Sequence, residues 1–198
     1  TYLFEGAILH RDSLGSVQEI TPGAVNWMTA GRGIVHSERR PRRLAQQAYV
    51  NHGLQLWAAL PAAHEEAEPS FSHTPAEALA PFAAGGAQVR VLIGEAFGRA
   101  SPVPTFSPTL YLDVQLPAGA ALDLPALAEE RAVYPVDADL QVDGSPLPAR
   151  HMGVLPAGAT VRLAAAQPVR LVVVGGAPLG RRHMWWNFVS SRKQRIVQ

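Results

Sequence analysis

A histidine and a glutamate stand two residues apart in the segment GRGIVHSERRPRR, which covers Gly31–Arg43. Successive side chains of a β-strand point to opposite faces, so an extended segment would place His36 and Glu38 on one face. An imidazole and a carboxylate together suit Zn, Mn, Ni or non-haem Fe(II), and Gly31 and Gly33 permit a close backbone approach before the strand. The other interpretation is that both side chains face water or hydrogen-bond to each other. The spacing by itself favours this second interpretation, because His-x-Glu is a weak signal.

Two ligands do not make a metal site, so the other histidines matter. His10 is the candidate third ligand, because Ala7–His10 has the pattern of a neighbouring strand. The remaining histidines fall in loops and at the ends of segments, and we expect each to be a surface or hydrogen-bonded residue: His52, His64, His73, His151 and His183.

Four arginines occur within Arg39–Arg43, directly after the His-x-Glu pair. Such a run resembles a phosphate-binding patch. It is also typical of a solvated loop, which we favour because one short run in a chain of net charge +1 lacks a wider basic face. The run can still bias the rim of a pocket towards anionic molecules.

The composition limits the class of protein. The chain has 198 residues, a net charge of +1 and no cysteine, so it has neither disulfides nor thiolate chemistry. The balanced charge does not favour nucleic acid or an anionic membrane as a direct partner. No apolar run reaches the ~18 residues of a membrane span and no export signal is visible, so we expect a cytoplasmic protein.

Short apolar or alternating runs, separated by turn residues, predict the elements that hold these side chains. The chain contains 17 Gly and 17 Pro, and long amphipathic helix patterns are nearly absent. This pattern predicts an all-β fold, an antiparallel sandwich or barrel. The first predicted strand begins at Thr1 with no preceding turn, so we expect further residues upstream of it.

A weak internal repeat suggests two copies of one β-barrel design. Thr21–Val25 (TPGAV) and Leu155–Ala159 (LPAGA) each supply a turn with Pro and Gly before a strand, and each follows an earlier acidic-Gly turn. The segment FGRASPVPTFSP, residues 97–108, carries three prolines and no alternation, which predicts a junction. We therefore divide the chain into residues 1–100 and 101–198.

Longer segments resemble the pirin family, a branch of the cupins. They are TYLFEGAILHRDSLGS, PGAVNWMTAGRGIVHSE, HGLQLWAALP, VRVLIGEAFGRASPVPTFSPTLYLDV and HMWWNFVSS, which together span nearly the whole chain. The resemblance implies a bicupin, with two double-stranded β-helix (jelly-roll) domains and little helix. Residues 1–100 would then form an N-terminal cupin domain that carries the metal site, its first strand incomplete. Residues 101–198 would form a metal-free C-terminal cupin domain whose last segment packs back.

The resemblance also implies a metal site made of three histidines and one glutamate. His36 and Glu38 match two of these ligands, and the other two lie in a His-Pro-His segment that would precede Thr1. On this basis His10 becomes a pocket residue or a support for the ligands. In the second repeat Glu129–Glu130 stand where the first histidine pair would fall, which is why we expect no metal there.

The chemistry implied by the resemblance is that of a quercetin 2,3-dioxygenase-type oxygenase, which cleaves the central ring of flavonols. Glu38 would be the catalytic base, beside one divalent transition metal, Fe(II) first and Ni, Mn or Zn as alternatives. Apolar residues that could form a flat pocket for an aromatic substrate are Ile34, Leu54, Leu56 and Trp57.

The resemblance leaves two other functions open. One is a non-enzymatic, iron-binding redox sensor that acts as a regulatory partner of another protein, and the other is a small-molecule binding module without catalysis. The densest aromatic cluster, Trp185–Phe188, can stack on a ligand. We interpret it instead as a contact that docks the chain terminus onto a barrel.

Overall fold

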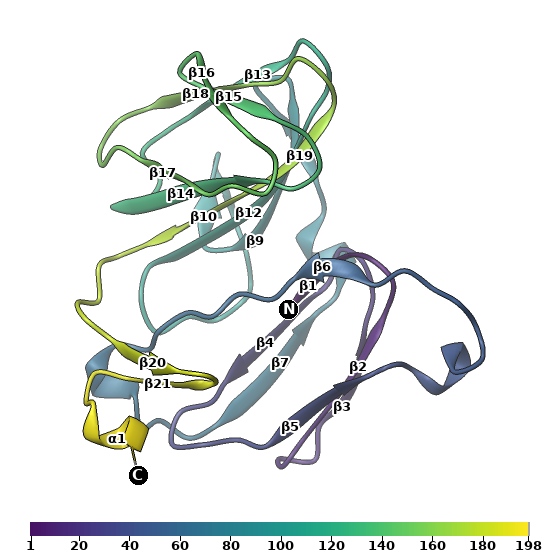
Figure 1. Ribbon diagram of the computed structural model, residues 1–198, viewed down its shortest axis with the longest axis vertical. Coiled ribbons are helices and arrows are strands. Elements are labelled where there is room, and N and C mark those ends of the chain that lie inside the picture. The colour runs from purple at the N-terminus through teal and green to yellow at the C-terminus, as the bar shows by residue number, and fades with distance from the viewer. Residues whose placement is uncertain (198) are drawn as a thin grey trace. The chain divides into compact units, whose positions relative to one another are not determined.

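Figure 1 shows the computed structural model of the chain, which describes residues 1–197. Contacts divide the chain into two compact units. Unit 1 comprises Thr1–Ala78 and the segment from Leu179 onward, and unit 2 comprises Leu79–Pro178. Nearly every regular element is a β-strand, which confirms the all-β prediction. The described helices are short: η1 (Arg42–Leu44), η2 (Ala62–His64), η3 (Ala76–Leu79) and α1 (Gln194–Val197).

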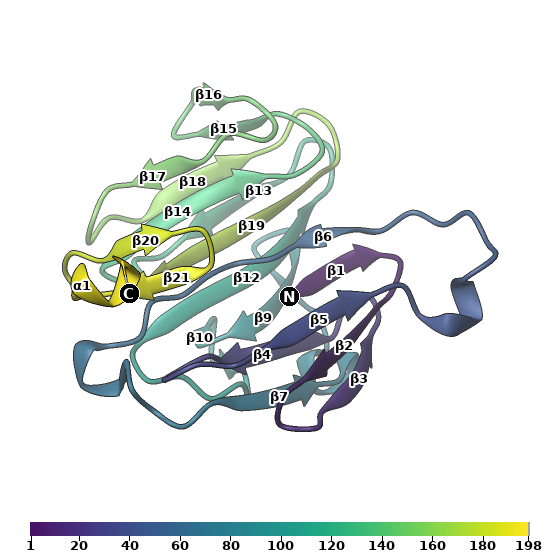
Figure 2. The same ribbon diagram turned by 60° about the horizontal axis from the view of Figure 1, so that its bottom comes forward.

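Unit 1 contains two antiparallel sheets and a hairpin (Figure 2). The four-stranded sheet has the order β6-β1-β4-β7, with β1 (Tyr2–Glu5), β4 (Val25–Thr29), β6 (His52–Leu54) and β7 (Ser70–Thr74). The three-stranded sheet has the order β3-β2-β5, with β2 (Ile8–Asp12), β3 (Val17–Ile20) and β5 (His36–Arg39). The hairpin pairs β20 (His183–Trp185) with β21 (Phe188–Ser190).

A small apolar cluster lies in the interior of unit 1. Leu3, Ile20 and Ala24 are at most 3% exposed, and Ile8 packs against them. Side chains two residues apart on a strand share a face, so His10 and Asp12 continue the face of β2 that begins with Ile8. The interior of unit 1 therefore changes from apolar to polar along β2.

Unit 2 is a sandwich of two larger antiparallel sheets. The six-stranded sheet, order β17-β14-β19-β12-β9-β8, contains β8 (Phe82–Ala84), β9 (Ala87–Ile93), β12 (Thr109–Leu116), β14 (Glu130–Pro135), β17 (Gly153–Leu155) and β19 (Val169–Gly176). The four-stranded sheet, order β13-β18-β15-β16, contains β13 (Ala121–Leu124), β15 (Leu140–Val142), β16 (Ser145–Leu147) and β18 (Val161–Ala164). A small hairpin pairs β10 (Glu95–Ala96) with β11 (Arg99–Ala100).

The core of unit 2 is continuous and apolar. Leu112 and Val114 of β12, Leu122 of β13, Leu163 of β18 and Leu171 of β19 are no more than 1% exposed and belong to one cluster. The alternating pattern of these strands places every second residue in this layer. Unit 2 thus has an interior of leucine and valine, whereas β2 of unit 1 buries the side chains of His10 and Asp12.

The two turns that suggested a repeat occupy equivalent places. Gly23 lies between β3 and β4 with φ = 88°, and Gly158 lies between β17 and β18 with φ = 69°. This left-handed backbone is most favourable for glycine, which the sequence supplies at both turns.

The compact units divide the chain differently from residues 1–100 and 101–198. Residues 79–100 belong to unit 2, because β9 pairs with β12 through the register Val89↔Val114 and Val91↔Leu112. The segment after Pro178 belongs to unit 1. The proline-rich segment 97–108 therefore lies inside unit 2, and the chain passes between the units near residues 78 and 178.

Among residues 1–197, no helix has the length and apolar character needed to cross a membrane.

Candidate functional site

The ladder between β2 and β5 places four polar side chains on one face. The register pairs His10 with Glu38 and Asp12 with His36. Directly opposed residues of an antiparallel pair share a face, as do residues two apart on one strand. The structure therefore brings His36 and Glu38 to the same face of β5, and it adds His10 and Asp12 beside them.

His10 and Asp12 form a buried, hydrogen-bonded pair. His10 Nε2 lies 3.0 Å from Asp12 Oδ2, and the two side chains are 2% and 0% exposed. Burial alone would raise the pKa of Asp12, but hydrogen bonds from His10 and from the N–H groups of Ser16 and Leu14 lower the pKa to about 2. Since the carboxylate only accepts hydrogen bonds, Nε2 of His10 carries a proton and is not available as a ligand. Nε2 of His10 is therefore used by Asp12, and the ring of His10 lies beside the predicted ligand His36.

The ring of His10 joins the two sheets of unit 1. One of its neighbours is Phe71 of β7, with ring centroids 4.2 Å apart and an interplanar angle of 8°. The other is His36, with centroids 5.8 Å apart and an angle of 21°. Offset stacking of this kind stabilises a pair by about 0.5–1.5 kcal/mol beyond burial. His10 thus fixes the plane of the predicted ligand His36.

Glu38 is held from the other sheet. The hydroxyl of Thr1 donates a hydrogen bond to Oε1 of Glu38 at 3.1 Å. Thr1 precedes β1, and its carbonyl accepts a hydrogen bond from the N–H of Asn26 on β4. Glu38 is partly buried, whereas His36 is exposed. The carboxylate therefore faces into unit 1 with one oxygen already hydrogen-bonded.

The turn before β5 depends on glycine. Gly31 has φ = 51°, and a Cβ built on it would lie 1.9 Å from the carbonyl oxygen of Ala67. The N–H of Arg32 donates to that same oxygen at 3.0 Å. Gly31 thus permits the close approach expected before the strand, between the β4–β5 loop and residues 65–68.

Sequence reasoning missed a further polar pair, on β4 and β7. Asn26 and His73 are opposed in the β4–β7 register, and His73 Nδ1 lies 2.7 Å from Asn26 Oδ1. His73 shares a face with Phe71, two residues earlier, so this pair faces the same interior as His10. The spacing of two residues between Phe71 and His73 indicates that both side chains lie on one face of the strand. It does not reveal which strand pairs with this one.

Among residues 1–197, no cluster of three or more His, Asp or Glu side chains has the arrangement of a complete metal site. What the structure provides is one imidazole and one carboxylate on adjacent positions of a single face. The residue types fit part of a metal coordination set. The assignment of His36 and Glu38 as ligands is a prediction that we develop below.

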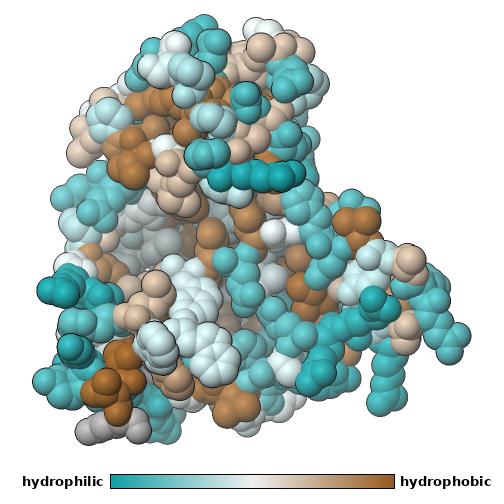
Figure 3. All heavy atoms as spheres, in the orientation of Figure 1, coloured by the Kyte–Doolittle hydropathy of each residue, from teal (hydrophilic) through white to brown (hydrophobic). Residues whose placement is uncertain are grey.

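The arginine run forms part of a protruding loop. Hydrophilic side chains dominate the loop that carries η1 (Figure 3). Arg43 pairs with Glu19, and Arg40 lies over the ring of Tyr49 at 4.9 Å. A groove of about 620 Å³ runs beside it and is lined by Glu5, Gly6, Ala7, Arg43, Leu44, Ala48, Tyr49 and Val50. None of the four polar side chains on the β2–β5 face lines this groove.

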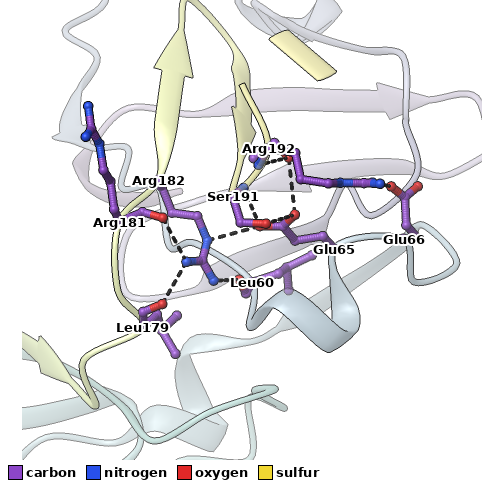
Figure 4. A network of polar contacts seen from close by, with 9 residues as sticks. Leu60, Glu65, Glu66, Leu179, Arg181, Arg182, Ser191 and Arg192 are labelled. Carbon is purple, nitrogen blue, oxygen red and sulfur yellow. Dashed lines mark hydrogen bonds and ion pairs between the residues drawn. The ribbon is translucent and has the colours of Figure 1, made fainter. Parts of the chain in front are cut away.

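The C-terminal segment is tied to unit 1 by polar contacts around Glu65 (Figure 4). The carboxylate of Glu65 accepts hydrogen bonds from the N–H and hydroxyl of Ser191 at 2.7 and 2.9 Å, and it pairs with Arg182 Nε at 3.0 Å. Arg182 also donates to the carbonyl of Leu60 at 2.8 Å. Burial would raise the pKa of Glu65, but the hydrogen bonds from Ser191 and Ser190, together with Arg182, lower it.

The aromatic residues of this segment do not make the docking contact. Trp185, Trp186 and Phe188 are 69%, 81% and 53% exposed. The prediction that they dock the terminus is wrong, because they lie at the tip of the β20–β21 hairpin, while Glu65, Ser191 and Arg182 make the attachment. Of the apolar pocket candidates, Leu56 and Trp57 are also exposed, at 36% and 54%.

Comparison with known proteins gives the family. The family model described as Pirin matches residues 1–58, and the model described as Pirin C-terminal cupin domain matches residues 111–198. A pirin-like protein of Caulobacter vibrioides is 46% identical over 199 residues, covering 100% of this chain and 69% of the relative. The chain belongs to the pirin family. The bicupin prediction is confirmed by these matches and by the two β-units.

Two further similar proteins carry an enzymatic name. A proposed quercetin 2,3-dioxygenase of Pseudomonas aeruginosa is 35% identical over 201 residues, covering 100% of this chain and 62% of that protein. A crystal structure titled quercetin 2,3-dioxygenase, from Acinetobacter baumannii, superimposes with a TM-score of 0.88 at 32% identity, covering 99% of this chain and 64% of that one. The chain spans 58–69% of the length of the curated relatives it matches.

Proposed function

We propose that this chain carries the metal-binding face of a quercetin 2,3-dioxygenase-type oxygenase, which opens the central ring of flavonols. The observation that carries the proposal is the shared face of β5, where His36 and Glu38 lie in register with Asp12 and His10. The names of the Pseudomonas and Acinetobacter proteins support the choice of reaction.

The donor set fits a divalent transition metal ion in part. His36 and Glu38 would hold it, and a His-Pro-His segment preceding Thr1, as the family resemblance implies, would complete the ligands. Fe(II) suits an imidazole and carboxylate set that handles O₂, and Ni, Mn and Zn share the preference for these ligands. When bound, the ion supplies a Lewis acid that holds the flavonol oxygens next to O₂.

The chain's own residues would orient the ligands and move one proton. Stacking on His10 holds the plane of His36, and the hydrogen bond from Thr1 holds Oε1 of Glu38. The carboxylate of Glu38 would accept the proton of the substrate hydroxyl as general base. In the overall reaction both atoms of O₂ enter the ring-opened product, and one ring carbon leaves as carbon monoxide.

The test uses the full-length protein loaded with Fe(II) and mixed with quercetin in air near neutral pH. We expect the flavonol absorbance to bleach and carbon monoxide to be released. Glu38→Gln should abolish bleaching, whereas Glu95→Gln, at an exposed position of β10 in unit 2, should leave it unchanged. Equal activity of Glu38→Gln and the wild type would dismiss the role as base, and a wild type that does not bleach quercetin would dismiss the reaction.

A second candidate function is an iron-dependent regulatory partner of another protein. One observation favours it: the opposite face of the same ladder carries exposed Arg11, which is paired with Ser37, and exposed Arg39, which directly follows Glu38. A change between Fe(II) and Fe(III) at the predicted ligands would then alter the charge one residue away from a basic outer surface. A pull-down with the Fe(II) and Fe(III) forms tests this, and partner capture that does not depend on oxidation state would count against it.

A further inference from the structure

The pair formed by Asn26 and His73 has no role in the mechanism above. Asn26 is 5% exposed, and within residues 1–197 its Nδ2 has no hydrogen-bond partner. A buried amide donor left without a partner costs about 1–3 kcal/mol, so such a group in a folded protein needs an explanation. A bound ligand that accepts its hydrogen bond would supply one.

The pair belongs to the same interior as the predicted metal ligands. Hydrogen bonds connect the pair to one of these ligands: the N–H of Asn26 donates to the carbonyl of Thr1, and the hydroxyl of Thr1 donates to Glu38. In the other direction, His73 shares a face of β7 with Phe71, which stacks on His10, which stacks on His36. Asn26 and His73 therefore stand on the β4–β7 wall, and His36 and Glu38 stand on the β2–β5 wall.

The hydrogen-bonding capacity of the pair matches a hydroxyl group. Oδ1 of Asn26 can only accept, so Nδ1 of His73 carries the proton of their 2.7 Å hydrogen bond. Burial lowers the pKa of His73, with the charge of Glu77 opposing this, so the ring stays neutral and its Nε2 is an acceptor. Together the pair offers one donor, Asn26 Nδ2, and one acceptor, His73 Nε2. The opposite orientation of the amide also leaves one donor and one acceptor.

We propose that Asn26 and His73 bind a hydroxyl group of the substrate, on the wall opposite the predicted metal ligands. This inference rests on the proposed function, because the ligand we assign to the site is a flavonol. The hydroxyl and carbonyl oxygens on the central ring of that ligand would lie at His36 and Glu38. A hydroxyl on an outer ring would donate a hydrogen bond to His73 Nε2 and accept one from Asn26 Nδ2. The pair would then discriminate polyhydroxylated flavonols from those with bare outer rings.

The first experiment compares quercetin with 3-hydroxyflavone, which lacks the outer hydroxyls. Full-length protein loaded with Zn²⁺ is titrated with both compounds in the absence of O₂, so that the oxygenation cannot proceed. We expect the wild type to bind quercetin about tenfold more tightly, the effect of one hydrogen bond to a buried polar group. His73→Phe should bind the two compounds within about twofold of each other. His73→Gln, which keeps a polar head, should restore part of the preference.

Controls separate this inference from the proposed function. His151→Phe, on an exposed loop of unit 2, should keep the wild-type preference, and Zn²⁺ content should be unchanged in every variant. Persistence of the full preference in His73→Phe would overturn the role of the pair. Failure of the wild type to bind either flavonol would overturn the proposed function.

A second measurement does not depend on metal or flavonol. Phenol is titrated into the metal-free protein, and the side-chain amide signals of Asn26 are followed by NMR. We expect these signals to shift in the wild type and to stay in place in His73→Phe. An unmoved Asn26 amide in the wild type would contradict hydroxyl binding, whatever the outcome with flavonols.

Discussion

The imidazole of His10 is stacked on the imidazole of His36, with ring centroids 5.8 Å apart. His10 is itself fixed by Asp12 and by the ring of Phe71. A predicted metal ligand that is exposed at its edge is therefore oriented by a side chain that is 2% exposed. Support of this kind from outside the ligand set is common at metal sites and is often needed for affinity.

Asp12→Asn should change how the stability of the protein depends on pH. The folded-state pKa of Asp12 is about 2, below its ordinary value of 3.8, so as pH falls the unfolded chain takes up the proton first. Stability contributed by Asp12 is complete above about pH 4–5 and is lost as pH falls towards 2. We expect the wild-type urea midpoint to fall through this window more steeply than that of the variant.

At pH 7 the same substitution should destabilise the protein by about 1–3 kcal/mol, because it replaces a charged acceptor of three hydrogen bonds, two of which are partly buried. Glu68→Gln is the matched control in unit 1, since the Glu68–Arg32 pair is exposed on both sides and should contribute less than about 1 kcal/mol. Parallel pH profiles for wild type and Asp12→Asn would contradict the assignment.

Glu65→Ala should release the C-terminal segment. The side chain of Glu65 is 11% exposed, and its carboxylate accepts hydrogen bonds from Ser190 and Ser191 and forms an ion pair with Arg182. Its loss therefore leaves buried groups without partners. We expect a loss of about 3–5 kcal/mol in segment stability, seen as faster amide hydrogen exchange in β20, β21 and α1. Glu66→Ala is the control, because Glu66 is 48% exposed and its pairs with Arg192 and Arg195 are at the surface. Exchange that is equally slow in both variants would show that the polar contacts do not hold the segment.

Gly31→Ala should destabilise the turn that leads into β5. The added methyl group would overlap the carbonyl of Ala67, and the left-handed φ of 51° is strained for alanine. Gly15→Ala measures the cost of the left-handed backbone alone, because Gly15 has φ = 90° and open space around its Cβ position. In urea unfolding, we expect Gly15→Ala to lower the free energy of unfolding by about 1 kcal/mol and Gly31→Ala to lower it by at least twice as much. Similar losses at the two positions would mean that the contact with Ala67 relaxes without cost.

Trp186→Asn should stabilise the hairpin. Trp186 is 81% exposed and has φ = 49° in the two-residue turn between Trp185 and Phe188. This left-handed conformation costs a bulky residue about 1–2 kcal/mol, whereas asparagine adopts it readily. The expected gain is about 1 kcal/mol, measured as slower amide exchange in β20 and β21. A loss of stability would show that the indole makes contacts that outweigh the strain.

Local patterns in the sequence predicted the parts of the site that lie on one strand. The alternation of His36, Ser37 and Glu38 correctly placed two side chains on one face, because strand geometry alone determines it. The pairing of His10 with Glu38, and of Asn26 with His73, depends on register between strands that are 28 and 47 residues apart. Nothing within either strand encodes that register, so His10 was only a candidate ligand, and His73 was expected to be a surface or hydrogen-bonded residue with no partner named.

Non-local pairing also explains why the compact units have other boundaries than the predicted division of the chain. The prolines of residues 97–108 suggested a junction, yet β9 and β12 on either side of it pair with each other. The prediction that the aromatic cluster Trp185–Phe188 docks the chain terminus was wrong for a related reason. The sequence shows that these side chains are hydrophobic, but it does not show whether a surface exists for them to pack against.

Unit 1 is assembled from both sides of unit 2 in the sequence, Thr1–Ala78 and the segment from Leu179 onward. During synthesis on the ribosome, Glu65 emerges more than a hundred residues before its partners Arg182 and Ser191 are translated. The Glu65 carboxylate of unit 1 therefore lacks these partners while the sandwich of unit 2 is being synthesised. A chaperone that binds the nascent chain at that stage would bind unit 1 before its C-terminal segment is present.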